Sequence, residues 1–160
     1  MPTDPAHLAT RERHLTASVL VLNGPNLDLL GRRDPAVYGT DTLADIEALC
    51  RGEAGRLGLE VEFFQSNHEG ALIDRVHDAF ERGQAIVVNA GGYSHTSIAL
   101  MDALAMVSAP VVEVHLSDIH AREEFRRHSF VTLVADAVIV GQGSAGYPMA
   151  LRHIARSLEA

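Results

Sequence analysis

The chain of 160 residues contains no lysine and no tryptophan, and Cys50 is its single cysteine. All thirteen basic residues are therefore arginines. Without lysine the chain cannot be a Schiff-base enzyme, cannot anchor pyridoxal phosphate and has no lysine for a phosphate-binding P-loop. A single cysteine excludes an intrachain disulfide and a cysteine-rich zinc site.

Positive charge is also scarce, because 21 acidic residues outweigh the arginines and give a formal net charge of −8. Nucleic acids and anionic membranes attract basic surfaces, so we expect neither as a partner. An anionic substrate would need a local cluster of arginines.

Long apolar runs are absent, since no stretch approaches the roughly 20 apolar residues that cross a bilayer. Residues 1–16 are polar and charged and lack the apolar centre of a secretory signal, so we expect a disordered leader there. With 47% hydrophobic residues, residues 17–160 are expected to form a single globular domain. The expected compartment is a reducing cytoplasm.

Short apolar runs alternate with helical periodicities along the rest of the chain. Strands are predicted over residues 18–22, 59–64, 85–88, 111–114 and 136–140. Helices are predicted over residues 42–57, 69–82, 97–107, 121–127 and 147–158, and a further apolar segment covers residues 130–134. Repeated strand–helix–strand units favour right-handed crossovers. The expected fold class is α/β, a flavodoxin-like three-layer sandwich with a five-stranded parallel sheet.

Such sheets bind ligands at the carboxyl ends of their strands, and polar residues follow each predicted strand here. The segment 26–39 after the first strand is longer than a usual strand–helix loop, which makes it a candidate lid. It carries Arg33 and Tyr38. A neighbouring cation favours the anionic form of a tyrosine, so Tyr38 is either a tyrosinate base or an exposed loop tyrosine.

Two histidines occupy places that suit chemistry. His115 and Glu113 lie two apart on a predicted strand and share a face, so His115 is either a general acid or a hydrogen-bonded core histidine. His95 stands in a glycine-rich loop before a predicted helix. That helix start could hold an anion, or Thr96 and Ser97 could simply cap it.

Two other patterns suggest cofactors but lack their context. Residues 141–146 (GQGSAG) match a dinucleotide fingerprint, yet only fourteen residues follow, so a tight strand–helix turn is favoured. The nine histidines show no metal-ligand spacing, with no cysteine or carboxylate cluster beside them. We therefore expect no metal and no cofactor.

The motifs together resemble those of type II 3-dehydroquinate dehydratases. They are residues 22–27 (LNGPNL), 31–35 (GRRDP) with 38–39 (YG), 65–70 (QSNHEG), 89–92 (NAGG), 95–97 (HTS), 113–117 (EVHLS), 120–126 (HAREEFR) and 141–147 (GQGSAGY). The likeness runs from about Val19 to the C-terminus, in the order and at the loop positions of that family.

The resemblance implies elimination of water from 3-dehydroquinate to give 3-dehydroshikimate through an enolate, without metal or Schiff base. It implies that Tyr38 is the base, that Arg33 stabilises its tyrosinate and that His115 is the acid. Asn26 would hold a water on the enolate oxygen, and Glu113 would support His115. The implied substrate-binding residues are Asn89, His95, Leu116, Ser117 and Arg126, with Asp102 reaching the site of a neighbouring subunit. The implied assembly is a homododecamer of four trimers.

Met101, Asp118 and Ser94 depart from the family's usual residues, and none of them is an implied catalytic position. Two readings from other classes stay open: a non-catalytic flavodoxin-like binding module and a metal-dependent hydrolase. The sequence leaves open whether the reaction would serve biosynthesis or quinate catabolism.

Overall fold

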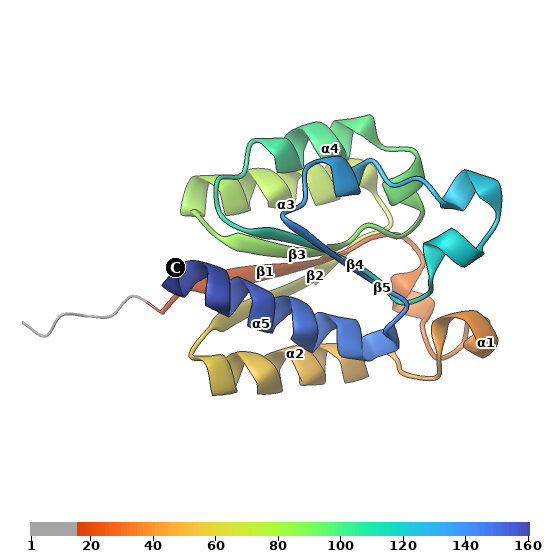
Figure 1. Cartoon of the computed structure of the whole chain (residues 1–160), viewed down its shortest axis with the longest axis horizontal. Coiled ribbons are helices and arrows are strands. Elements are labelled where there is room, and N and C mark those ends of the chain that lie inside the picture. The colour runs from red at the N-terminus through yellow and green to blue at the C-terminus, as the bar shows by residue number, and fades with distance from the viewer. Residues whose placement is uncertain (1–15) are drawn as a thin grey trace, which may run out of the picture.

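A parallel sheet of five strands forms the centre of the computed structural model, which describes residues 16–160 (Figure 1). The strand order is β2-β1-β3-β4-β5. The strands are β1 (Ser18–Asn23), β2 (Glu60–Gln65), β3 (Ala85–Asn89), β4 (Val111–His115) and β5 (Ala137–Val140). All four pairings are parallel, so the carboxyl ends of the strands lie along one edge. The expected leader, residues 1–16, lies outside the described residues except for Thr16.

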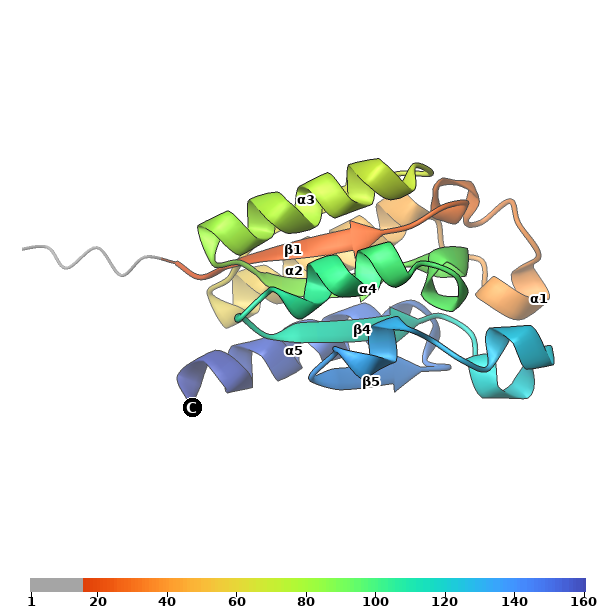
Figure 2. The same cartoon turned by 90° about the horizontal axis from the view of Figure 1, so that it is seen from above.

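Helices cover both faces of the sheet, which gives three layers (Figures 1 and 2). The helices α2 (Leu43–Leu57) and α5 (Gly146–Glu159) pack on one face. The helices α3 (Glu69–Arg82) and α4 (Ile98–Ala105) pack on the other. Because both faces are covered, every residue of β3 is buried. The predicted α/β sandwich with a five-stranded parallel sheet is confirmed.

Local signals in the sequence explain where these helices begin and end. Thr42 and Asp45 form a capping box at the start of α2, where each side chain accepts a hydrogen bond from the other's backbone N–H. Gly58 and Gly83 end α2 and α3 in left-handed conformation, which glycine adopts without steric cost.

One predicted helix is wrong. Residues 121–127 form no continuous helix but belong to two 3-10 turns, Ile119–Ala121 and Glu124–Arg126. Arg122 between them is extended, with φ −98° and ψ −170°, and its side chain reaches Tyr38. A helix of seven residues has little stability of its own, so this contact and the loop packing decide the conformation. The apolar segment 130–134 likewise contains a 3-10 turn, Val131–Leu133.

The segment after β1 folds over the carboxyl edge of the sheet, where the connecting loops gather (Figure 2). It contains a 3-10 turn, Leu27–Leu29, and the short helix α1 (Pro35–Tyr38). Residues 141–146 form the tight turn between β5 and α5, with Gly141 and Gly143 at positive φ. Between residues 16 and 160, no helix is long and apolar enough to cross a membrane.

Candidate active site

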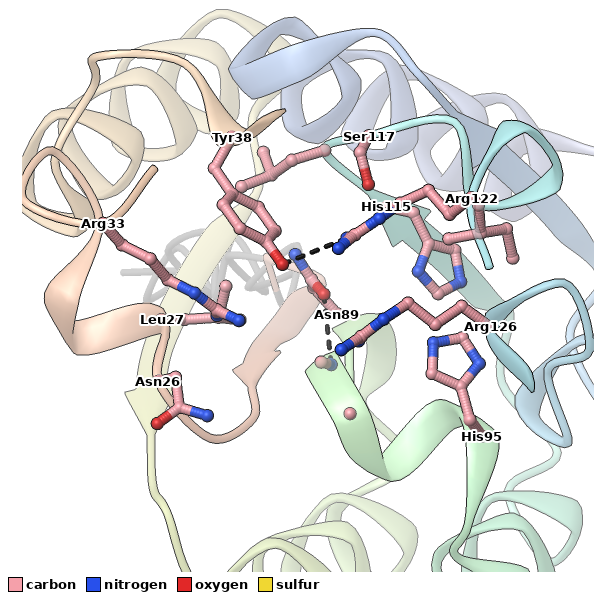
Figure 3. Close-up of a pocket in the computed structure, with 14 residues that line it drawn as sticks. Asn26, Leu27, Arg33, Tyr38, Asn89, His95, His115, Ser117, Arg122 and Arg126 are labelled. Atoms are coloured by element: carbon pink, nitrogen blue, oxygen red, sulfur yellow. Dashed lines mark hydrogen bonds between the residues drawn. The ribbon is translucent and has the colours of Figure 1, made fainter. Parts of the chain in front are cut away.

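A cavity of about 190 Å³ opens at the carboxyl edge of the sheet (Figure 3). Segments that follow β1, β3 and β4 form its walls. The lining residues are Asn26, Leu27, Arg33, Tyr38, Asn89, Gly91, Gly92, His95, His115, Leu116, Ser117, Ile119, Arg122 and Arg126. Polar and charged side chains therefore converge from segments far apart in the sequence.

Two arginines bracket the Tyr38 ring. Nη1 of Arg122 donates a hydrogen bond of 3.0 Å to the Tyr38 hydroxyl oxygen, the contact drawn as a dashed line in Figure 3. Cζ of Arg33 lies 4.3 Å from the ring centroid of Tyr38. The Tyr38 hydroxyl oxygen therefore accepts a hydrogen bond from one guanidinium, and a second guanidinium lies over its ring.

His115 is joined to a buried carboxylate. Its Nε2 lies 2.6 Å from Oε1 of Glu113, which is fully buried at the base of the cavity wall. The hydroxyls of Ser129 and Thr132 also donate hydrogen bonds to Glu113. Burial by itself would raise the pKa of Glu113, but the hydrogen bonds from His115, Ser129 and Thr132 outweigh it and hold that pKa below its usual value. Glu113 is therefore an anion at neutral pH, and it holds the His115 ring through Nε2.

His95 is held by the backbone. Its Nδ1 lies 2.7 Å from the carbonyl oxygen of His128, and its ring stacks beside His115 with centroids 6.4 Å apart. Burial lowers the pKa of His95 below its usual value, and the bond to the carbonyl opposes this shift only in part. The neutral ring must donate its Nδ1 proton to the carbonyl, so Nε2 keeps a free lone pair.

The loop before α4 shows how its hydroxyls are used. The Ser97 side chain accepts a hydrogen bond of 2.9 Å from the Leu100 backbone N–H and so caps α4. This confirms the capping role that the sequence allowed for Ser97. An anion at this helix start stays a prediction.

Two asparagines come from the ends of β1 and β3. Asn26 adopts a left-handed conformation with φ 67°, and its backbone N–H donates to Oδ1 of Asn67. Asn89 is buried, and its Oδ1 accepts a hydrogen bond from the Gly91 N–H. Both side chains line the cavity (Figure 3).

Most residues expected at the site line this cavity, namely Asn26, Arg33, Tyr38, Asn89, His95, His115, Leu116, Ser117 and Arg126. Glu113 lies behind His115 rather than on the surface of the cavity. Asp102 is exposed on α4 and does not line it, so its place in a neighbouring subunit's site stays a prediction.

Sequence reasoning missed Arg122 and the apolar wall residues Leu27 and Ile119. Arg122 stands in the same motif as Arg126, and this was the available signal.

The carboxylates and histidines of the site do not form a metal centre. In the part of the chain that the structure describes, no three His, Cys, Asp or Glu side chains gather closely enough to hold an ion. The arrangement pairs a cation-stabilised phenol with a carboxylate-bound imidazole across one cavity, which suits proton abstraction and proton donation on one small substrate.

Comparison with known proteins agrees with this chemistry. The family model described as dehydroquinase class II matches residues 17–155. The 3-dehydroquinate dehydratase of Dinoroseobacter shibae is 59% identical over 133 residues, 83% of this chain and 89% of that protein. The catabolic 3-dehydroquinase 2 of Aspergillus flavus is 52% identical over 141 residues, 88% of this chain and 94% of that protein.

A solved structure points to the same family. The crystal structure of type II dehydroquinase from Propionibacterium acnes superposes with a TM-score of 0.86 at 43% identity, covering 89% of this chain and 99% of that one. The family match spans nearly all the described residues, and the relatives align over most of their length. The chain therefore belongs to the class II dehydroquinases, the type II 3-dehydroquinate dehydratases, which are hydro-lyases.

Proposed function

We propose that this enzyme removes water from 3-dehydroquinate through an enolate, with Tyr38 as base and His115 as acid. The observation that carries the proposal is the placement of both residues on one cavity, each with its own charged partner. Arg122 donates a hydrogen bond to the Tyr38 oxygen and Arg33 lies over its ring, while Glu113 bonds Nε2 of His115.

In the first step the Tyr38 phenolate takes a proton from the carbon next to the ketone. The C–H electron pair moves into a C=C bond, and the carbonyl oxygen becomes an enolate oxygen. A water held by Asn26 would donate a hydrogen bond to that oxygen. Arg122 would donate a hydrogen bond to the phenolate oxygen during the transfer, and Arg33 would lie over its ring.

In the second step the enolate re-forms the ketone and expels the hydroxyl from the neighbouring carbon. His115 donates its proton to this oxygen, so the leaving group departs as water. The Glu113 carboxylate holds the imidazole ring through its Nε2. Return of one proton from Tyr38 to His115 restores both groups.

The remaining polar groups of the cavity would hold the substrate. Arg126 offers a cation to the substrate carboxylate, and Ser117 and the Leu116 segment offer hydrogen bonds. Neutral His95 presents the Nε2 lone pair, so it would accept a hydrogen bond from a substrate hydroxyl. Asn89 would bind a second oxygen.

The pathway is a separate proposal. Relatives include proteins named 3-dehydroquinate dehydratase and proteins named catabolic 3-dehydroquinase. We assign this chain to the shikimate pathway and aromatic amino-acid biosynthesis. Deletion of its gene should cause a requirement for aromatic amino acids, whereas loss of growth on quinate alone would place the enzyme in catabolism.

Assembly, location and domain limits are proposed as well. Residues 17–160 would form one catalytic domain, assembled as a dodecamer of four trimers in which Asp102 reaches a neighbouring site. Light scattering should give about twelve times the 17.2 kDa chain mass, and a monomer mass would refute the assembly. Cys50 is a buried free thiol, and burial raises its pKa to about 12, which suits a reducing cytoplasm.

The decisive experiment is an assay with 3-dehydroquinate. The purified enzyme should produce rising enone absorbance, and neither a chelator nor borohydride with substrate should stop it. Loss of activity in chelator would favour the metal-dependent reading. A folded protein that binds 3-dehydroquinate without turnover would favour the binding module and sink the proposal.

A further inference from the structure

Tyr147 lies in the first turn of α5 and is completely buried beneath the sheet edge. Its hydroxyl sits between two amide side chains, those of Asn23 and Asn89. These asparagines are register partners at the carboxyl ends of the neighbouring strands β1 and β3. The mechanism above uses Asn89 but assigns nothing to Tyr147 or Asn23.

The hydrogen bonds at this point run in one direction. Nδ2 of Asn23 donates to the Phe64 carbonyl at 3.3 Å, so Oδ1 of Asn23 is left as an acceptor. The Tyr147 hydroxyl donates to that Oδ1 at 2.7 Å. A hydroxyl has one proton, so its oxygen can only accept from Asn89, whose Nδ2 lies 3.0 Å away.

The direction of these hydrogen bonds fixes the orientation of the Asn89 amide. The Tyr147 oxygen needs a hydrogen-bond donor from Asn89, and the Gly91 N–H needs a hydrogen-bond acceptor from it. Both hydrogen bonds form only when the Asn89 amide has Nδ2 toward Tyr147 and Oδ1 toward Gly91. One N–H of Nδ2 then remains unused, on a side chain that lines the cavity (Figure 3).

We propose that Tyr147 is a positioning residue that, with Asn23 behind it, fixes the Asn89 amide as a hydrogen-bond donor to a substrate oxygen. This deepens the proposed dehydratase function and rests on it. Burial raises the pKa of Tyr147, so the hydroxyl stays protonated. The direction of its hydrogen bonds is therefore the same at all working pH values. Tyr147 itself touches no substrate.

The test is a double-mutant cycle with Tyr147→Phe and Asn89→Ala. Removing the hydroxyl leaves the buried Asn89 donor and Asn23 acceptor unpaired, and only the Gly91 N–H still holds the Asn89 amide, so kcat/KM should fall about tenfold. In the Asn89→Ala background the same change should cost nothing further. An equal loss in both backgrounds, or full activity of Tyr147→Phe, would overturn the proposal.

A matched control breaks another buried side-chain bond of the same sheet. Nε2 of Gln84 donates to the Ser18 hydroxyl at 2.6 Å, at the amino end of β1 and away from the cavity. Ser18→Ala should lower the melting temperature and leave kcat/KM unchanged. A loss of kcat/KM equal to that of Tyr147→Phe would mean that stability alone explains both.

Two further measurements keep the inference open to refutation. If Tyr147→Phe does not fold, Asn23→Ala removes the acceptor behind the hydroxyl and should lower kcat/KM only when Asn89 is present. If the unaltered enzyme has no dehydratase activity, the proposed function fails by itself. A crystal structure of Tyr147→Phe then decides the positioning role, because an Asn89 amide still in place would refute it.

Discussion

Nη1 of Arg122 donates a 3.0 Å hydrogen bond to the hydroxyl oxygen of Tyr38, across 84 residues of sequence. Arg33 meets the same ring through its face, with Cζ 4.3 Å from the centroid. The two arginines therefore act differently on one group. Arg122 bonds the oxygen that would carry the charge, whereas Arg33 contacts the ring face from the segment after β1.

Removing either arginine should slow the reaction, and Arg122 should matter more. Arg122→Met removes a donor to the phenolate and should lower kcat about 10²- to 10³-fold. Arg33→Met removes a cation–π contact and should cost about tenfold. Arg32→Met is the matched control, because exposed Arg32 does not line the cavity; an equal loss there would discredit the assignment.

Removing the base or the acid should abolish most turnover without unfolding the protein. Tyr38→Phe and His115→Ala should each lower kcat about 10²- to 10⁴-fold. The measurements are steady-state kinetics beside circular dichroism. A Tyr38→Phe enzyme that keeps its native spectrum and more than a tenth of its activity would remove Tyr38 from the mechanism.

Ser129→Ala should shift the acid limb of the pH–activity profile to higher pH. Hydrogen bonds, with that of Ser129 among them, keep the pKa of Glu113 below its usual value against the opposing effect of burial. The stability from its ionised form is present above the unfolded pKa, about 4.3, and is lost as pH falls through the folded pKa. Without Ser129 the carboxyl should protonate at higher pH. The check is kcat/KM from pH 4 to 8, where an unchanged acid limb would contradict it.

His95 should make the fold sensitive to mild acid. Burial holds its pKa below the usual value, so on acidification the unfolded chain binds the proton before the folded one does. Stability is therefore complete above about pH 6.5 and falls below it, by at most about 1.4 kcal/mol per pH unit. Urea unfolding of His95→Asn should lack this slope. Parallel curves for the two proteins would show that other groups produce it.

Two glycine substitutions should change stability in opposite directions. A Cβ on Gly24 would lie 2.1 Å from the Ala90 carbonyl oxygen, so Gly24→Ala should destabilise by about 3 kcal/mol. Gly55 lies in α2 with open space around it, and Gly55→Ala should stabilise by about 0.5–1 kcal/mol. Thermal unfolding of both variants measures these changes. The Gly24→Ala result tests the close backbone approach between the segments that follow β1 and β3.

The sequence predicted what depends on local periodicity and capping. Buried strands such as Ala85–Asn89 and a helix start such as Thr42 carry their signals within a few residues, and the structure confirms them. The prediction of a helix over residues 121–127 was wrong, because Arg122 is extended there and its side chain bonds Tyr38, a contact distant in sequence that no local pattern indicates.

The residues of the site could be predicted from the sequence, but the hydrogen bonds between them could not. Parallel strands place Asn89 and His115 at one edge by topology, so their convergence follows from the fold class. No pattern within residues 127–134 indicates that the His128 carbonyl would fix His95 or that Ser129 would bond Glu113. Such contacts depend on the path of a loop, which tertiary packing decides.

The arginines of the cavity stand in a chain whose formal charge is −8. An approaching anion is thus repelled at long range and attracted only at the mouth of the cavity. Salt at physiological concentration screens exposed charges beyond about 8 Å, whereas the partly buried guanidinium groups are screened less. Moderate ionic strength should therefore speed capture of an anionic substrate, the reverse of what an electrostatically steered enzyme of complementary net charge would show.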